Sequence, residues 1–532
     1  MGNIIAQCWH KCDRRMLTAS AVQGALFSIA TVLGTRMKAH GTLAGFGMGQ
    51  IALAVLFTAV YAAALYGLFS LMNRANREKE PKKESLFSKI TGNWFVVFVL
   101  LLACWVPVWL AFWPGLFTSD TLTQFYSYYN EELSSHYPLL HTIFLGWVMM
   151  LGIDMHPEGA ATWGVAIYCG IQLVLVAGCV AYACAWMRRR KVPLCARLIV
   201  SLLFMLSPFY APWGFYPEKD VVFGVMVLVF CLQVADLWTF GLKPLRVIAF
   251  VLISLLMMFM RNNGVYALVL LVPFAILWAK GRRVKIGALL CVCIALFLAL
   301  NSLLISVLYA EKGSKVEILS TPLQQIARTL RDHPEAIELD EDGVLETLYG
   351  DVNPADLYTE WCSDPVKWDV DYDLLDDYIP DLLHLWAKMC AKYFPTFADA
   401  FVVQNLPYIL PGCNMASNFD LFVVQGEWFP IEKNSFLPGL QQIYETYDIN
   451  RVFMDVQATR ILSDPAVFVW LAMTGLAYAL VKKRYGLASA FGFLVAVWFT
   501  SLLGPIAVMR YVLCLYYAVP VLWAALFMPQ KS

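Results

Sequence analysis

Long apolar runs constrain the fold of this chain more than any other feature. Stretches of about twenty residues with almost no charge recur along it, and about twenty apolar residues suffice to cross a bilayer. Only 15% of the 532 residues are charged and 60% are hydrophobic, whereas soluble domains carry about 25% charged residues. The sequence predicts an all-α polytopic membrane protein with about twelve transmembrane helices. We expect them at 17–35, 51–72, 94–113, 163–187, 194–212, 221–239, 247–262, 264–279, 286–309, 465–482, 487–503 and 507–527.

Acidic residues are concentrated in one segment. Residues 310–464 hold 27 of the 39 acids but only 10 of the 39 bases, and this segment lies between apolar runs. We therefore predict a water-facing, mainly helical or mixed domain there. Its cysteines Cys362, Cys390 and Cys413 allow one disulfide at most. The predicted divisions are an N-terminal hairpin with a basic loop (1–93), a seven-helix core (94–309), the acidic domain (310–464) and a three-helix segment (465–532).

Basic runs set the predicted topology, because Lys and Arg mark cytoplasmic loops. The strongest runs lie at 74–89, 188–191, 280–285 and 482–484. All four fall on one side only if 138–152 is not a full crossing. That stretch has 15 residues and starts at Pro138, so we predict an interfacial or re-entrant helix. The predicted topology puts both termini in the cytoplasm and residues 310–464 outside the plasma membrane. It also leaves Arg36 and Lys38 outside.

Asp120 follows the span 94–113 in a segment without Lys or Arg. Thr118, Ser119 and Asp120 would make a good helix start, which is one interpretation of the acid. A carboxylate at a membrane surface is also a candidate for chemistry, because such charges are expensive there. Both interpretations stay open on local sequence.

A second acidic loop, Glu218-Lys219-Asp220, lies on the same predicted face. Lys219 would hold either carboxylate ionised. The alternative is that both acids cap the helix that follows, where acids favour the helix dipole.

Two further polar breaks lie at this predicted depth. Arg261 is followed by Asn262 and Asn263 between apolar runs, and such a break permits backbone that lines a cavity. Arg510, next to Tyr511, is a second intramembrane cation. Arginine suits bidentate phosphate binding, although a snorkelling side chain and a structural ion pair are the alternatives.

His136 and His141 flank Tyr137-Pro138 shortly after Asp120. Together with Asp120 they would offer nitrogen and oxygen ligands to a divalent metal. Nothing in their spacing fixes a ligand set, so no cofactor is certain and a metal remains an alternative to a surface role.

The order of these parts resembles the GT-C superfamily of integral membrane glycosyltransferases, which take sugars from polyprenyl-phosphate carriers. The likeness covers 94–309: a first span, Thr118-Ser-Asp-Thr-Leu-Thr-Gln in an outer loop, His136-Tyr-Pro-Leu-Leu-His141, then the Glu218 loop. An outer domain follows the seventh span, as in protein O-mannosyltransferases. The acid at 120 stands alone instead of in an Asp-x-Asp pair, which weakens the case for a metal, and His136-Tyr137-Pro138 replaces a His-Pro-Pro-type turn.

The resemblance implies an enzyme with Asp120 as general base, Glu218-Lys219-Asp220 as the second acidic loop, and Lys219, Arg261 and Arg510 as candidate phosphate ligands. His136, His141, Asn262, Asn263 and Tyr511 would then contact acceptor, sugar or metal. The expected partners are a polyprenyl-phosphate-linked sugar, membrane lipids and an extracytoplasmic glycan, lipid or protein acceptor, and no nucleic acid.

Two other classes compete with this interpretation. A secondary transporter often has twelve spans, but it commonly shows paired repeats with midplane sites, and here a single outer insert separates nine predicted spans from three. A non-catalytic membrane scaffold would have no cavity joining Asp120, Glu218 and Arg261.

Overall fold

Helices make up the regular structure of this protein. The computed structural model describes residues 13–77, 85–157, 161–279, 281–413, 429–446 and 463–529, and within these ranges only isolated β-bridges accompany the helices. The predicted all-α class is therefore confirmed for the described part of the chain.

Six described helices are long and apolar enough to cross a membrane, which makes the chain a membrane protein by length and composition. The described apolar helices also include seven shorter ones of 10–17 residues, so the count of twelve crossings stays a prediction. The six are α2 (Arg14–His40), α3 (Met48–Arg77), α5 (Trp94–Ala111), α8 (Thr162–Arg189), α11 (Lys219–Phe240) and α14 (Arg283–Val307). The shorter ones are α7 (Leu139–Met155), α9 (Leu194–Leu206), α12 (Pro244–Met260), α13 (Asn263–Trp278), α24 (Pro465–Val481), α25 (Tyr485–Ser501) and the stretch Met509–Ala525, which comprises η4 (Met509–Val512) and α26 (Leu513–Ala525).

The predicted span 194–212 is not continuous. Helix α9 ends at Leu206, and the short buried helix α10 (Tyr210–Gly214) follows. Pro208 between them explains the break, because proline lacks the N–H that would continue the helix. Thirteen residues of α9 reach only about 20 Å at 1.5 Å per residue. This stretch is therefore a half-length helix followed by a turn that brings 215–220 back to the bundle.

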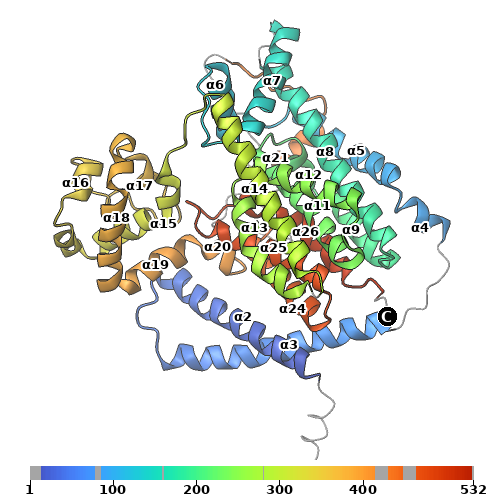
Figure 1. Cartoon of the computed structure of the whole chain (residues 1–532), viewed down its shortest axis with the longest axis horizontal. Coiled ribbons are helices and arrows are strands. Elements are labelled where there is room, and N and C mark those ends of the chain that lie inside the picture. Colours follow the sequence, from blue (N-terminus) through green and yellow to red (C-terminus); the bar gives the residue numbers. More distant parts are fainter. Residues whose placement is uncertain are drawn as a thin grey trace, which may run out of the picture.

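Helix α11 lies at the centre of the bundle. It packs against α8, α12, α25 and α26, and it is the most buried of the six long helices (Figure 1). A helix that is apolar all round is expected to be buried in this way. Its N-terminal end carries the predicted acidic loop, so the fold presents that loop at one end of the bundle.

The acidic segment begins with a separate helical unit. Residues between Val316 and Phe397 form a hydrophobic core of their own, built by α15 (Ser320–Asp332), α16 (Val344–Tyr349), α17 (Asp364–Trp368), α18 (Tyr372–Lys392) and α19 (Phe394–Gln404). Figure 1 shows α15 to α18 beside the bundle rather than within it. The later helix α21 (Pro438–Thr446) packs against α5 instead. Cys362 and Cys390 are free thiols.

The N-terminal hairpin of α2 and α3 contacts this acidic unit through its connecting loop. Arg328 donates to the carbonyl of Gly41 at 2.9 Å, and Asp399 accepts the backbone N–H of Leu43 at 2.8 Å. Lys38 donates to the carbonyl of Gly412 at 2.9 Å. The basic end of α2 thus lies against the acidic segment, and the side of the membrane on which both lie stays a prediction.

Candidate functional site

Two loops meet where α6 (Ser119–Tyr129) and α11 begin. Thr118 caps α6, since its hydroxyl oxygen accepts the backbone N–H of Thr121. Asp120 therefore lies in the first turn and is not the capping residue. Its side chain is turned to partners from other parts of the chain, which leaves the acid available for a role beyond helix initiation.

Asp120 lies between two cations. Its Oδ2 accepts from Lys219 Nζ at 2.9 Å and from Arg510 Nη1 at 3.0 Å. Burial alone would raise the pKa of this carboxyl, but Lys219 and Arg510 outweigh burial and hold the pKa well below its usual value. Asp120 is consequently ionised in this structure, and its side chain is still 22% exposed.

Glu218 is the most buried acid of the cluster, with no exposed side-chain surface. Its Oε1 accepts from the Thr118 hydroxyl and from Arg510 Nη1 at 3.3 Å, while Oε2 lies 3.8 Å from Lys219 Nζ. It makes no capping hydrogen bond to α11. Burial raises the pKa of Glu218, and the charge of Asp120 raises it further against the opposing cations. Glu218 thus binds a proton more readily than an ordinary glutamate does.

Asp220 and Arg261 form the second half of the cluster through an ion pair. The guanidinium carbon of Arg261 lies 4.0 Å from the ring centroid of Tyr511, a cation–π contact. Arg510 Nε lies 4.0 Å from Asp220 Oδ2, so Arg510 connects the two halves. Three acids and three bases from four sequence-distant segments therefore form one cluster, which we call the ion cluster: Asp120, Glu218, Lys219, Asp220, Arg261 and Arg510.

Tyr137 and Thr118 were not predicted as site residues, yet both contact the ion cluster. Lys219 Nζ lies 5.0 Å from the ring centroid of Tyr137. Burial, reinforced by Asp120, raises the pKa of Tyr137 to about 12, so the phenol stays neutral at physiological pH. Tyr137 stands between the two predicted histidines, and its position in the His-Tyr-Pro motif was the available signal.

The predicted histidines separate in the structure. His136 is exposed, and after Lys219 and Arg510 it makes a smaller contribution to the low pKa of Asp120. His141 is buried, with Nδ1 at 2.7 Å from Gln124 Oε1 and Nε2 at 2.7 Å from the Tyr168 hydroxyl. Both ring nitrogens of His141 are therefore occupied by structural hydrogen bonds. Among the described residues, no three His, Cys, Asp or Glu side chains are grouped to hold a metal ion.

Asn262 and Asn263 occupy the start of α13. Asn262 is exposed and Asn263 is half-buried. Within the described ranges neither side chain has a hydrogen bond. Both amides thus follow Arg261 directly in sequence, at the edge of the site, and their hydrogen-bonding groups are not used by the described chain.

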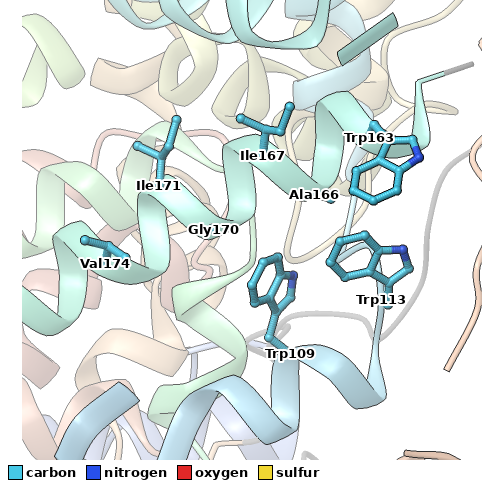
Figure 2. Close-up of a pocket in the computed structure, with 8 residues that line it drawn as sticks. All are labelled: Trp109, Trp113, Trp163, Ala166, Ile167, Gly170, Ile171 and Val174. Atoms are coloured by element: carbon cyan, nitrogen blue, oxygen red, sulfur yellow. The ribbon is translucent and has the colours of Figure 1, made fainter. Parts of the chain in front are cut away.

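An apolar groove of about 500 Å³ runs between α5 and α8. Figure 2 shows the indoles of Trp113 and Trp163 next to each other at one end and the indole of Trp109 beside Gly170. Val174 in its wall is 50% exposed, so the groove is open at the helix surface. The chain passes from Trp113 to Asp120 within seven residues, and the N–H of Leu116 binds the carbonyl of Phe215 at 3.1 Å. The groove and the ion cluster are therefore joined by one short loop.

Comparison with known proteins places the chain in a family without an assigned activity. No curated protein and no solved structure matches it. The family match includes the Glu218 loop and Arg261, whereas Asp120 and Arg510 lie outside the matched residues. The model described as "Family of unknown function (DUF6020)" matches residues 130–409, more than half of the sequence, and the chain belongs to this family.

Proposed function

We propose that this protein is a membrane glycosyltransferase that moves a sugar from a polyprenyl-phosphate donor to an extracytoplasmic acceptor with inversion. The observation that carries the proposal is the position of Asp120 between Lys219 and Arg510, which are 99 and 390 residues away in sequence. Such a displacement needs a carboxylate that takes the acceptor proton and cations that stabilise the leaving phosphate. The ion cluster supplies both kinds of group within one site.

The two oxygens of Asp120 are used differently. Oδ2 receives both cations, whereas Oδ1 makes no hydrogen bond with any described residue. The side chain is partly exposed. We assign Oδ1 as the atom that accepts the proton of the acceptor hydroxyl.

A strongly ion-paired carboxylate is a weak base. The low pKa of Asp120 must therefore rise before this residue can take a proton from the acceptor. A donor phosphate would compete for Lys219 and Arg510, both of which now bind Asp120. Losing part of that pairing raises the pKa of Asp120 toward its usual value. Donor binding would in this way convert a resting ion pair into a competent base.

In the displacement the acceptor oxygen forms a bond to the anomeric carbon of the sugar. The bond between that carbon and the phosphate oxygen breaks, and its electron pair leaves with the polyprenyl phosphate. The hydroxyl proton passes to Asp120. Lys219 and Arg510 stabilise the phosphate charge, and Arg261, held by Asp220, is the third phosphate ligand.

The remaining predicted contacts surround this centre. Tyr511 lies under Arg261, and we assign His136, Asn262 and Asn263 to acceptor or sugar binding because they lie at the exposed edge. The apolar groove beside Trp109 is suited to the first isoprene units of the donor, since it is apolar and open at the helix surface. The topology that fits this chemistry puts the ion cluster outside the plasma membrane and both termini in the cytoplasm.

The test uses the full chain reconstituted in liposomes with a panel of undecaprenyl-phosphate-linked radiolabelled hexoses. Asp120→Asn should abolish transfer of label from the lipid while the protein still folds and binds undecaprenyl phosphate. Asp376→Asn is the matched control, because Asp376 pairs with Lys315 in an exposed part of the acidic unit. Full activity in Asp120→Asn, or equal loss in the control, would remove Asp120 from the chemistry.

The transporter and scaffold alternatives give different results in the same liposomes. A transporter would move the lipid-linked or free sugar across the bilayer without breaking its bond to phosphate. A scaffold would do neither, and Asp120→Asn would then change only stability. Release of undecaprenyl phosphate as a product distinguishes the transferase from both.

A further inference from the structure

A polar cavity lies at the end of α11 opposite the ion cluster. Lys219 begins this helix and Asp236 lies 17 residues later, which is about 25 Å along a helix at 1.5 Å per residue. The cavity has a volume of about 820 Å³, within the range of ligand-binding pockets. It is therefore a site separate from the ion cluster.

Among the described residues that line this cavity, six of the seven charged ones are cations. They come from three separate segments: the end of α8, the link before α14 and the link between α24 and α25. Among the described residues that line it there is one carboxylate, Asp236, which already pairs with Arg190. The lining cations are Arg189, Arg190, Lys191, Arg282, Lys483 and Arg484.

Most of these cations have no anionic partner in the part of the chain that the structure describes. Arg189, Lys191, Arg282, Lys483 and Arg484 form no ion pair with a carboxylate of the described chain. Arg484 instead donates to the carbonyls of Leu526 and Met528 at 2.7 and 2.9 Å. Burial lowers the pKa of the Arg484 guanidinium from its usual value. Gathering like charges is unfavourable, and the described residues leave most of the positive charge of this cavity uncompensated.

Topology alone does not account for this arrangement. Positively charged cytoplasmic loops orient a membrane protein, but orientation requires no convergence of the charges around a cavity. The wall also contains the aromatic residues Trp186, Trp238 and Trp278. The indole Nε1 of Trp238 and the Nε of Arg190 are buried and have no acceptor among the described residues. Two residues of the wall thus carry donors that have no partner in the described chain.

We propose that this cavity binds a phosphate-bearing ligand at the end of the bundle opposite Asp120. Arginines in a fork geometry and lysine ammonium groups are the side chains that recognise phosphate. The volume and the indole walls leave room for an organic group beside the phosphate. The same chemistry belongs to an anionic lipid headgroup and to a soluble phosphate compound, which the experiment separates.

The experiment uses the purified full chain with two probes. Binding of inorganic pyrophosphate is measured by calorimetric titration. For the lipid probe, the protein is placed in phosphatidylcholine nanodiscs prepared with or without phosphatidylglycerol, and native mass spectrometry measures how much phosphatidylglycerol it retains. The double variant Arg282→Gln/Lys483→Gln should weaken binding of at least one probe at least tenfold. Binding of pyrophosphate alone identifies a soluble ligand, retention of lipid alone identifies a headgroup, and competition between them identifies one shared site.

The matched control is Arg283→Gln/Lys285→Gln, which removes two exposed cations of the same helix start that do not line the cavity. This control should change binding less than threefold. Equal weakening in both double variants would mean general surface charge and would overturn the proposal. Failure of both probes to bind the unmodified protein would overturn it as well. Neither result depends on glycosyl transfer at Asp120.

Discussion

Arg510 holds the ion cluster together, and its removal should be costly. Arg510→Gln deprives Asp120 of one of two cations and Glu218 of its closest one, at 3.0 and 3.3 Å. Removing one partner of a buried ion pair costs about 3–5 kcal/mol. The Arg510 side chain is 26% exposed, so we expect a loss of about 3 kcal/mol, the lower end of that range.

The part of this loss due to Glu218 can be separated with a double-mutant cycle. Glu218→Gln keeps an acceptor for the Thr118 hydroxyl but removes the buried charge. Hydrogen bonds to charged groups contribute about 1.5–3 kcal/mol, and the 3.3 Å distance to Arg510 places this one at the lower end. Arg510→Gln should therefore cost about 1.5 kcal/mol less in the Glu218→Gln background than alone.

The pH dependence has a defined sign. Loss of a cation raises the pKa of Asp120 and Glu218 in the folded state, and the folded pKa of Glu218 is already above its ordinary value of 4.5. A raised carboxyl pKa contributes stability that is present below pH 4.5 and lost as the pH rises through the folded value. The cost of Arg510→Gln should thus be smaller at pH 5 than at pH 8.

Equilibrium unfolding of the detergent-solubilised protein in SDS, followed by tryptophan fluorescence, measures all four members of the cycle. Phosphate ligands are kept out of the buffer because they would bind the same cations. A coupling free energy below about 0.5 kcal/mol would mean additive, independent sites. That result, or a cost of Arg510→Gln that falls as the pH rises, would refute the geometry on which the argument rests.

Three further predictions concern other parts of the molecule. A Cβ at Gly170 would lie 3.2 Å from Trp109 in the groove, whereas at Gly178 it would have 3.9 Å of clearance from Trp94. Gly170→Leu should therefore reduce binding of undecaprenyl phosphate at least fivefold in native mass spectrometry while Gly178→Leu leaves it unchanged; equal effects would exclude the groove. Asp236 is the one carboxylate among the described residues that line the polar cavity at the other end of α11. Asp236→Asn removes it, so calorimetry should show severalfold tighter pyrophosphate binding, and weaker binding would argue against the site. Tyr137→Phe keeps the ring beside Lys219. Because the phenol has a pKa of about 12, the pH dependence of the transfer rate should stay the same below pH 9. Loss of one titration from that pH dependence would assign Tyr137 a proton-transfer role.

The helical class was predictable because apolar length alone indicates it. The break after Leu206 was visible as Pro208, but the surrounding apolar residues made 194–212 read as one span. Hydropathy reports whether a residue is buried, not whether it is buried in lipid or in protein. Residues 210–216 are buried against other helices, which no window of hydropathy distinguishes from a crossing.

The candidate site was predictable from charge rather than from local motif. Asp120, the Glu218 loop, Arg261 and Arg510 were each selected as charges near a membrane surface, where charges are expensive, and the fold brings them together. His141 was not separable from His136 in this way. A histidine on a mostly apolar helix is satisfied by whichever polar neighbours pack against it, here Gln124 and Tyr168, and those partners depend on tertiary structure.

The hydrogen bonds of the ion cluster differ from those expected of a purely structural link between helices. Buried polar groups in a purely structural network are expected to be satisfied, because an unpaired buried acceptor costs about 1–3 kcal/mol. Here Glu218 Oε2 and Asp220 Oδ2 are buried without a hydrogen-bond donor among the described residues. Asp120, which is partly exposed, accepts from two cations through a single oxygen. Acceptors without a donor are expected where a ligand that donates hydrogen bonds completes the set, and under the proposed function the hydroxyl groups of the sugar or of the acceptor would be such donors.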